Sequence, residues 1–149
     1  MNPFRAFGFA LAPLLGAALL PAAAQARTGC RISVGASADG SFAQAGYDAR
    51  PARLRPLAAA TRDRFTAAAR RLCGAGVLRQ SDLARFRKLV VQNGEGATEA
   101  LIYRDETMER GTFVFQFAFQ NGGPPTAVEF ERALRCWKRP QAPGCDSGD

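Results

Sequence analysis

Histidine is absent from this chain of 149 residues, and lysine occurs only at Lys88 and Lys138. Without an imidazole, Ser-His-Asp and Cys-His hydrolases, histidine-ligated zinc enzymes and histidine acid–base catalysts are excluded. A serine–lysine catalytic pair has little support, because neither lysine lies three residues after a serine. An enzyme built on this sequence would depend on carboxylates or on an unusual tyrosine or arginine site.

One acidic run supplies candidate carboxylates: Glu95, Glu99, Asp105, Glu106 and Glu109. Two of these side chains could form a general acid and base at the spacing that glycosidases use. A carboxylate-dependent glycan hydrolase is therefore the alternative function, and Glu99 and Asp105 are the residues to test first. Acidic residues at hairpin ends also serve solubility, so the sequence favours a protein that is not an enzyme.

A hydrophobic run long enough to span a bilayer is also lacking. The apolar stretch from Phe7 to Leu20 has 14 residues, whereas a spanning helix needs about 20. It follows Arg5 and precedes Ala24-Gln25-Ala26, the pattern of a secretory signal peptide with its cleavage site.

We therefore expect residues 1–26 to be removed, and residues 27–149 to be one periplasmic or secreted domain with no membrane span. Retention of the segment as a membrane anchor is a less favoured alternative. Lipidation of Cys30 is disfavoured because Arg27 occupies the position where a lipidated cysteine needs an apolar residue.

Close-set cysteine pairs, which a zinc site requires, are missing. The four cysteines, Cys30, Cys73, Cys136 and Cys145, are separated by 43, 63 and 9 residues. We expect no metal and no cofactor. An even number of cysteines in an exported chain predicts two disulfides. Three pairings are possible, and the proline-bearing turn between Cys136 and Cys145 favours that bridge, which leaves Cys30 to pair with Cys73.

In the first half of the exported part, Cys30–Val34 is expected to form a short strand. Asp39-Gly40 is a hairpin-type turn signal, with Ser41–Tyr47 as a weakly supported return strand. Leu57–Cys73 is predicted to be a helix, because its apolar residues fall within one arc at helical spacing. Those residues are Leu57, Ala58, Thr61, Phe65, Ala68, Ala69 and Leu72.

In the second half, residues 82–92 are expected to be helical, although Val90-Val91 fits a strand better. Glu99–Arg104 and Thr112–Gln120 are predicted strands. The second of these places four phenylalanines on one face: Phe113, Phe115, Phe117 and Phe119. Burial of each ring is worth about 2 to 3 kcal/mol, which favours a core over an exposed aromatic platform for a ligand.

The last predicted helix begins after Thr126, where Thr126 and Glu129 form a capping box, and ends near Lys138. These elements predict an α+β fold: a small antiparallel sheet packed in two layers against about three helices, with two disulfides.

Charge is unevenly distributed along the chain. Arg27–Lys88 holds thirteen basic and four acidic residues, whereas Leu89–Asp149 holds six basic and nine acidic residues. The first half is therefore suited to an anionic partner. Two simpler interpretations compete with this one. Arginine is abundant in a composition rich in alanine, glycine and proline, and the acidic run can fold back against the arginines.

Residues 48–56, DARPARLRP, contain two prolines and three arginines, which predicts an extended linker. A pre-extended segment presents Arg50, Arg53 and Arg55 at low entropy cost, and these are the candidate partner-binding residues. The alternative is a linker whose arginines are only solvated and bind no partner. The sequence thus predicts an exported, disulfide-stabilised binding domain of unspecified partner, with an anionic envelope polymer or an acidic protein surface as the expected target.

Overall fold

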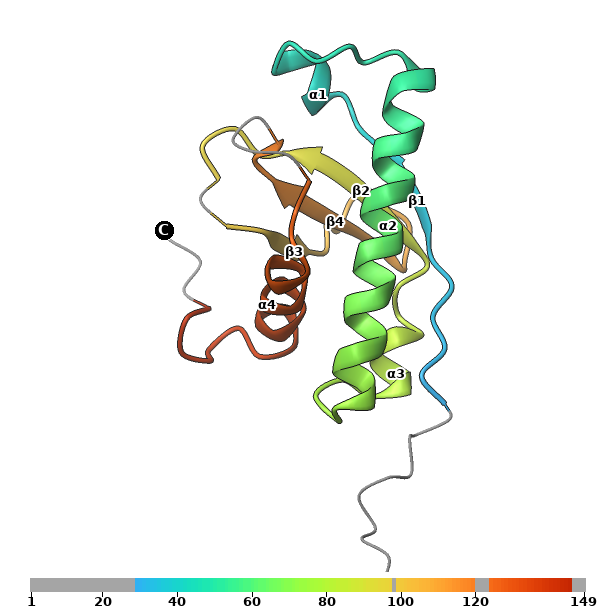
Figure 1. Ribbon diagram of the computed structural model, residues 1–149, viewed down its shortest axis with the longest axis vertical. Coiled ribbons are helices and arrows are strands. Elements are labelled where there is room, and N and C mark those ends of the chain that lie inside the picture. Colours follow the sequence, from blue (N-terminus) through green and yellow to red (C-terminus); the bar gives the residue numbers. More distant parts are fainter. Residues whose placement is uncertain (1–28, 98, 120–123, 146–149) are drawn as a thin grey trace, which may run out of the picture.

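The computed structural model describes residues 29–97, 99–119 and 124–145, which form four helices and four strands (Figure 1). In chain order the elements are β1 (Gly35–Ala38), α1 (Ser41–Gln44), α2 (Pro51–Gly74), α3 (Gln80–Leu83), β2 (Lys88–Asn93), β3 (Leu101–Tyr103), β4 (Thr112–Phe117) and α4 (Ala127–Lys138). This composition confirms the α+β class. The expected signal peptide, residues 1–26, lies outside the described residues.

The four strands form one sheet in the order β1-β2-β4-β3. β2 runs parallel to both β1 and β4, and β3 runs antiparallel to β4. The sheet is therefore mixed and not antiparallel as expected. The reason is that α2 lies between β1 and β2 in the chain, and a connection through a helix returns the next strand in the same direction.

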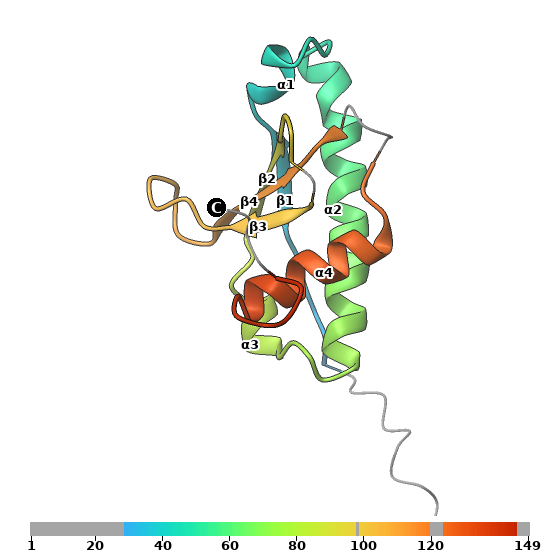
Figure 2. The same cartoon turned by 90° about the vertical axis from the view of Figure 1, so that its left-hand side faces the viewer.

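Two long helices cover one face of the sheet. Figure 2 shows α2 and α4 on the same side of the strands, and their inner residues belong to one hydrophobic cluster with β2 and β4. The expected two layers are thus present. None of the helices in the described part of the chain is long and apolar enough to cross a bilayer.

The start of the described chain differs from the prediction. Cys30–Val34 is irregular, and β1 begins only at Gly35. The expected return strand is instead the single-turn helix α1, because the Asp39 carboxylate accepts a hydrogen bond from the Ser41 amide (3.0 Å). Such a turn favours helical continuation, and it directs the fully buried Phe42 into the core.

Helix α2 confirms the predicted helix Leu57–Cys73 but begins six residues earlier, at Pro51. The expected extended linker at residues 48–56 was therefore wrong over most of its length. Pro51 occupies the first helical position, where its missing N–H is not needed. Pro56 removes only one further helical hydrogen bond, which packing over the remaining turns can offset.

Residues 82–92 are not one helix. The short helix α3 ends at Leu83, and β2 begins at Lys88. Leu89 and Val91 face the helices and are fully buried, while Val90 on the opposite face is only 8% exposed. A strand covered on both faces shows no alternation of polar and apolar residues, which is why the pattern resembled a helix.

The other two strands were predicted correctly. β3 lies within the predicted Glu99–Arg104, and β4 lies within the predicted Thr112–Gln120, of which Gln120 is outside the described residues. Three of the four phenylalanines on this face are buried and the fourth packs against the same cluster: Phe113, Phe115, Phe119 and Phe117. The core interpretation is confirmed, and no aromatic platform is exposed by these four residues.

Helix α4 begins at the predicted capping box. The Thr126 amide donates to the Glu129 carboxylate (2.6 Å), and the Glu129 amide donates to the Thr126 hydroxyl (3.4 Å). Phe130 and Leu134 are fully buried on its inner face. The ring of Phe130 stacks on that of Phe115, with 4.6 Å between centroids, which fixes α4 on the sheet.

Both disulfides have the pairing that the sequence favoured. Cys30 joins Cys73 with Cα atoms 5.9 Å apart, and Cys136 joins Cys145 with Cα atoms 5.1 Å apart. The first bridge ties the irregular chain before β1 to the end of α2. The second ties the segment after α4 back to that helix.

Candidate anion-binding site

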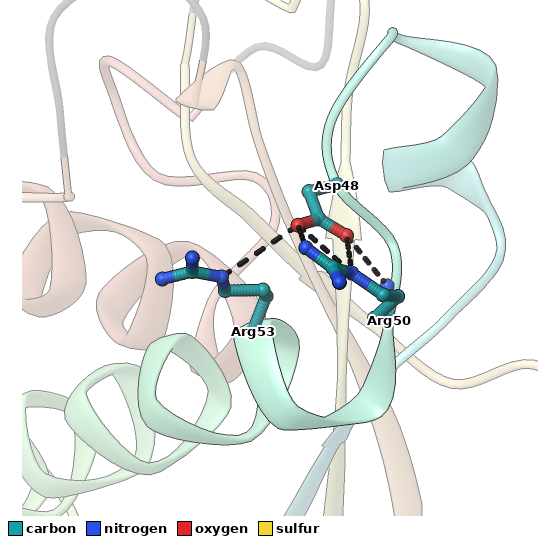
Figure 3. Close-up of polar contacts among 3 residues, drawn as sticks. All are labelled: Asp48, Arg50 and Arg53. Carbon is teal, nitrogen blue, oxygen red and sulfur yellow. Dashed lines mark hydrogen bonds and ion pairs between the residues drawn. The ribbon is translucent and has the colours of Figure 1, made fainter.

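The arginines singled out from the sequence lie at the start of α2, and two of them are already paired (Figure 3). Arg50 donates to both carboxylate oxygens of Asp48, from Nε to Oδ1 at 2.8 Å and from Nη2 to Oδ2 at 2.5 Å. Nε of Arg53 lies 3.6 Å from Oδ2 of the same carboxylate. The hydrogen bond from Arg50 holds the pKa of Asp48 below its usual value.

Arg55 lies apart from this pair. Its side chain lines a groove beside β1, together with residues of α2. The three guanidinium groups therefore do not converge on one site, and two of them share a neutralising carboxylate. The helical start of α2 also removes the extended geometry on which their predicted role depended.

Four other arginines line one pocket of about 480 Å³: Arg85, Arg87, Arg104 and Arg110. Ala84, Gly111 and Phe113 complete its walls. All four arginine residues are exposed to solvent. We call this feature the arginine pocket.

The topology of the sheet brings these four residues together. Arg85 and Arg87 lie between α3 and β2, Arg104 directly follows β3, and Arg110 comes two residues before β4. β2 and β4 are parallel neighbours, and β3 is antiparallel to β4. The start of β2, the end of β3 and the start of β4 therefore lie at the same end of the sheet.

Gly111 joins the two loops that form the pocket. Its carbonyl oxygen accepts hydrogen bonds from the amides of Arg87 (2.9 Å) and Lys88 (3.2 Å). Its φ of +92° favours glycine, and a Cβ built there would lie 2.9 Å from both Cγ and Cδ of Arg87. Glycine at this position therefore lets the Arg87 side chain lie directly against the β3–β4 connection.

Among the described residues, no carboxylate forms a direct ion pair with an arginine of the pocket. Across residues 29–97, 99–119 and 124–145, ion pairs involve arginines elsewhere, such as Arg71 with Glu131 and Arg132 with Glu99, but none of the four pocket arginines. The Arg85 guanidinium lies 5.1 Å from the centroid of the Trp137 ring, a cation–π contact that holds the group without cancelling its charge. Asp82 lies close enough to Arg85 for their charges to interact, but its carboxylate is bonded to Lys138, so the four guanidinium groups keep their hydrogen-bond donors free of carboxylate partners in the described part of the chain.

The two carboxylates that the sequence put first for a hydrolase, Glu99 and Asp105, are both engaged in other contacts. Glu99 pairs with Arg132. Asp105 accepts hydrogen bonds from the hydroxyl (2.6 Å) and amide (2.9 Å) of Thr107, and these bonds lower its pKa. A general acid in a glycosidase needs a raised pKa, so Asp105 is poorly suited to that role.

The described residues also contain no group of three or more potential metal ligands. Comparison of the chain with protein-family models, with curated proteins and with solved structures gave no match. The function must therefore be argued from the geometry of the chain itself.

Sequence reasoning missed the arginine pocket. Arg104 and Arg110 belong to the half of the chain with net negative charge. The net charge of each half therefore gave no indication of a basic site that includes them. A weak signal was present, because Arg85-Phe86-Arg87 precedes one strand and Arg104 and Arg110 flank the connection between two others. Only the pairing of those strands makes the four residues neighbours.

Proposed function

We propose that this chain is an exported binding domain whose arginine pocket takes an anionic group carried by an envelope polymer. The observation that supports this proposal is the convergence of four arginines on one cavity, none of them in a direct ion pair with a carboxylate of the described residues. Two disulfides and a leader-like segment at residues 1–26 suit a protein that acts outside the cytoplasm.

Guanidinium groups are well matched to such a ligand. Each presents a planar set of donors that fits the oxygens of a phosphate or carboxylate in a bidentate manner, and each stays charged at every physiological pH. Like charges held close together repel one another, and an anion that enters between them relieves this repulsion. The pocket therefore gains more from an anion than isolated surface arginines do.

A matched pair of variants tests the site. The triple change of Arg85, Arg104 and Arg110 to alanine removes three charges from the pocket. The triple change of Arg50, Arg53 and Arg55 to alanine removes the same charge from the start of α2. Binding of the oxidised chain to polyphosphate and to poly-glutamate is measured by isothermal titration calorimetry at several NaCl concentrations.

We expect the pocket variant to bind at least about tenfold more weakly, a change of about 1.4 kcal/mol, and the α2 variant to stay within about threefold. Affinity of the unmodified chain should fall as salt rises, because exposed charges are screened. Equal losses in the two variants would show that only net charge matters. A larger loss in the α2 variant would restore Arg50, Arg53 and Arg55 as the contact.

The same titration separates the polymer from an acidic protein as the partner. Each internal unit of polyphosphate carries one negative charge shared by two oxygens on the chain atom itself, so successive charges lie close together and several guanidinium groups can contact them at once. The carboxylates of poly-glutamate are set apart at the ends of flexible side chains. We expect polyphosphate to bind more tightly than poly-glutamate of equal charge. The reverse order would assign the pocket to an acidic protein surface, and no binding of either probe would contradict the proposal.

A further inference from the structure

The edge of β1 is a second candidate for binding, at the opposite end of the sheet from the arginine pocket. The amide of Gly35 donates to the carbonyl of Arg87 (2.9 Å), and the amide of Asp39 donates to the carbonyl of Val91 (3.1 Å). Because backbone groups alternate in direction along a strand, the N–H and C=O groups of Ala36 and Ala38 point away from β2.

In the part of the chain that the structure describes, no strand lies on this outward side of β1, which is the terminal strand of the sheet. Within residues 29–97, 99–119 and 124–145, no group accepts a hydrogen bond from the amide of Ala36 or Ala38. Edge strands are usually protected by charged side chains, proline or a bulge. The sequence of β1, Gly-Ala-Ser-Ala, has none of these side chains.

A groove of about 370 Å³ runs along this edge. One side is formed by residues 36–40, and the other by the segment that leads into α2 and by the first two turns of that helix. Ala49, Pro51, Leu54 and Ala58 make the helical side mostly apolar. The groove therefore combines a row of backbone donors and acceptors with an apolar wall.

The groove also carries one charged residue of each sign, Asp39 and Arg55. Arg55 lines it and takes part in no ion pair with the described residues. The Asp39 carboxylate accepts hydrogen bonds from the amide and the hydroxyl of Ser41, neutral donors that hold it at the end of β1 and leave it charged. An occupant with a carboxylate opposite Arg55 would be complementary in charge.

We propose that this groove binds an extended peptide segment of another exported protein, which adds a strand to the edge of β1. The segment pairs through its backbone with Ala36 and Ala38, places a small apolar side chain against Leu54 and Ala58, and presents an acidic side chain to Arg55. This mode of recognition takes its affinity from main-chain hydrogen bonds and its specificity from alternate side chains.

Charge and backbone chemistry favour a peptide over other occupants. A glycan or a phosphate polymer has no backbone amides spaced to pair with a strand. A second copy of this chain that paired through its own β1 would bring Gly-Ala-Ser-Ala, a strand with no carboxylate to place opposite Arg55. The site is distinct from the arginine pocket, because the groove lies beside the end of β1 and the pocket lies at the start of β2.

A peptide of alternating threonine and valine that ends in aspartate is a suitable probe, labelled with fluorescein for anisotropy. Two N-methylated forms, one on the valines and one on the threonines, each remove the donors from one edge of the peptide. Pairing with β1 uses one edge only. We expect one form to bind at least about tenfold more weakly and the other to retain its affinity within about threefold.

Two protein variants test whether the probe binds at the edge of β1. Ala38→Pro removes an outward N–H that β2 does not use, a change that edge strands tolerate, and should reduce binding at least about tenfold. Arg55→Ala should reduce binding of the aspartate peptide about tenfold and that of an asparagine analogue little. Arg62→Ala, on the same helix but outside the groove, is the control and should change neither.

Amide hydrogen exchange gives an independent measurement on the same samples. The amides of Ala36 and Ala38 should become protected when the peptide binds, whereas those of Gly35 and Asp39 should change little. Equal loss with both N-methylated peptides, or unchanged binding to Ala38→Pro, would overturn the proposal. Self-association that Ala38→Pro abolishes, seen by sedimentation, would assign the edge to a second copy and also overturn it.

Discussion

Asp82 joins two segments that are far apart in the chain. Its carboxylate accepts a hydrogen bond from Nζ of Lys138 in α4 (2.6 Å) and another from the amide of Arg79 at the start of α3 (2.8 Å). Burial acts to raise the pKa of Asp82, but these bonds and the charges of Lys138 and Arg85 outweigh burial and leave the pKa below its ordinary value. The carboxylate thus fixes α3 to α4 only while it is ionised.

The first prediction is that Asp82→Asn destabilises the protein in a way that depends on pH. A carboxyl with a lowered folded pKa stabilises the fold above its unfolded pKa, about 3.8, and loses this effect as the pH falls through the folded pKa. We expect a loss of about 2 kcal/mol at pH 7, disappearing well below pH 4. Urea unfolding of both proteins between pH 2.5 and pH 7 measures it, and a constant difference across this range would contradict the assignment.

Gly111 is a second residue at which a small substitution should affect the protein, because an added Cβ would crowd the Arg87 side chain. Its positive φ and its contact with the Arg87 side chain both oppose any larger residue. We predict that Gly111→Ala costs about 1 to 3 kcal/mol of stability and weakens polyphosphate binding by moving Arg87.

Gly74→Ala is the matched control for this change. Gly74 ends α2 without a positive φ, and a Cβ there meets no atom within 4 Å. The substitution should be neutral or stabilise by up to about 1 kcal/mol, with unchanged binding. Thermal melts and calorimetry on the three proteins decide the outcome, and a Gly111→Ala protein as stable as the control would refute the role of Gly111.

At the scale of elements, the two disulfides constrain different parts of the fold. Cys30–Cys73 closes a loop of 43 residues and anchors the irregular chain before β1 to α2. Cys136–Cys145 closes only 9 residues beyond α4, a helix already fixed by its capping box and buried aromatic rings. Near the longer bridge, Arg31 exchanges two hydrogen bonds of 2.8 Å with the Gln80 side chain, and Ile32 is buried. The larger effect expected of this bridge therefore rests on the length of the loop that it closes.

We predict that replacing both Cys30 and Cys73 with serine destabilises the protein more than replacing both Cys136 and Cys145. Loop-closure entropy gives about 4 kcal/mol for the long bridge and about 2.7 kcal/mol for the short one. Guanidinium unfolding of the two double variants measures the difference. Equal midpoints, or a less stable Cys136/Cys145 variant, would show that the N-terminal half is held by other contacts.

At the scale of the whole molecule, one cluster of buried side chains connects the sheet with α2 and α4. The Cys30–Cys73 bridge is part of it, because Cys73 is buried in the cluster and Cys30 packs against it. The fully buried side chains include five phenylalanines: Phe42, Phe65, Phe115, Phe130 and, at 2% exposure, Phe86. Domains of this size are stable by only about 5 to 15 kcal/mol. The loss of both bridges would remove a large share of this free energy of unfolding.

The fourth prediction is that full reduction lowers the melting temperature by more than about 10 °C and makes the chain prone to aggregate, because each lost kcal/mol shifts the midpoint by several degrees. Scanning calorimetry with and without reductant tests this, with a thiol count to confirm reduction. Chain produced in a reducing cytoplasm should aggregate more than chain produced by export. Equal melting temperatures in both redox states would show that the cysteines are not structural.

The sequence alone determined the features that depend on neighbours in the chain. Helical periodicity identified most of α2, the Thr126 capping box placed the start of α4, and alternating phenylalanines identified β4. The two disulfides followed from the even number of cysteines and from the short turn between Cys136 and Cys145. Apart from the Cys30–Cys73 pairing, which followed by elimination, each of these signals acts within a few turns or residues and can therefore be read along the chain.

The tertiary structure decided what depends on pairing between distant segments. Strand direction followed from the placement of α2 between β1 and β2, and β2 resembled a helix because both of its faces are covered. Arg85 and Arg104 became neighbours only when β2, β4 and β3 aligned side by side. Register and adjacency arise from contacts across the sheet, and no local pattern in the sequence encodes them.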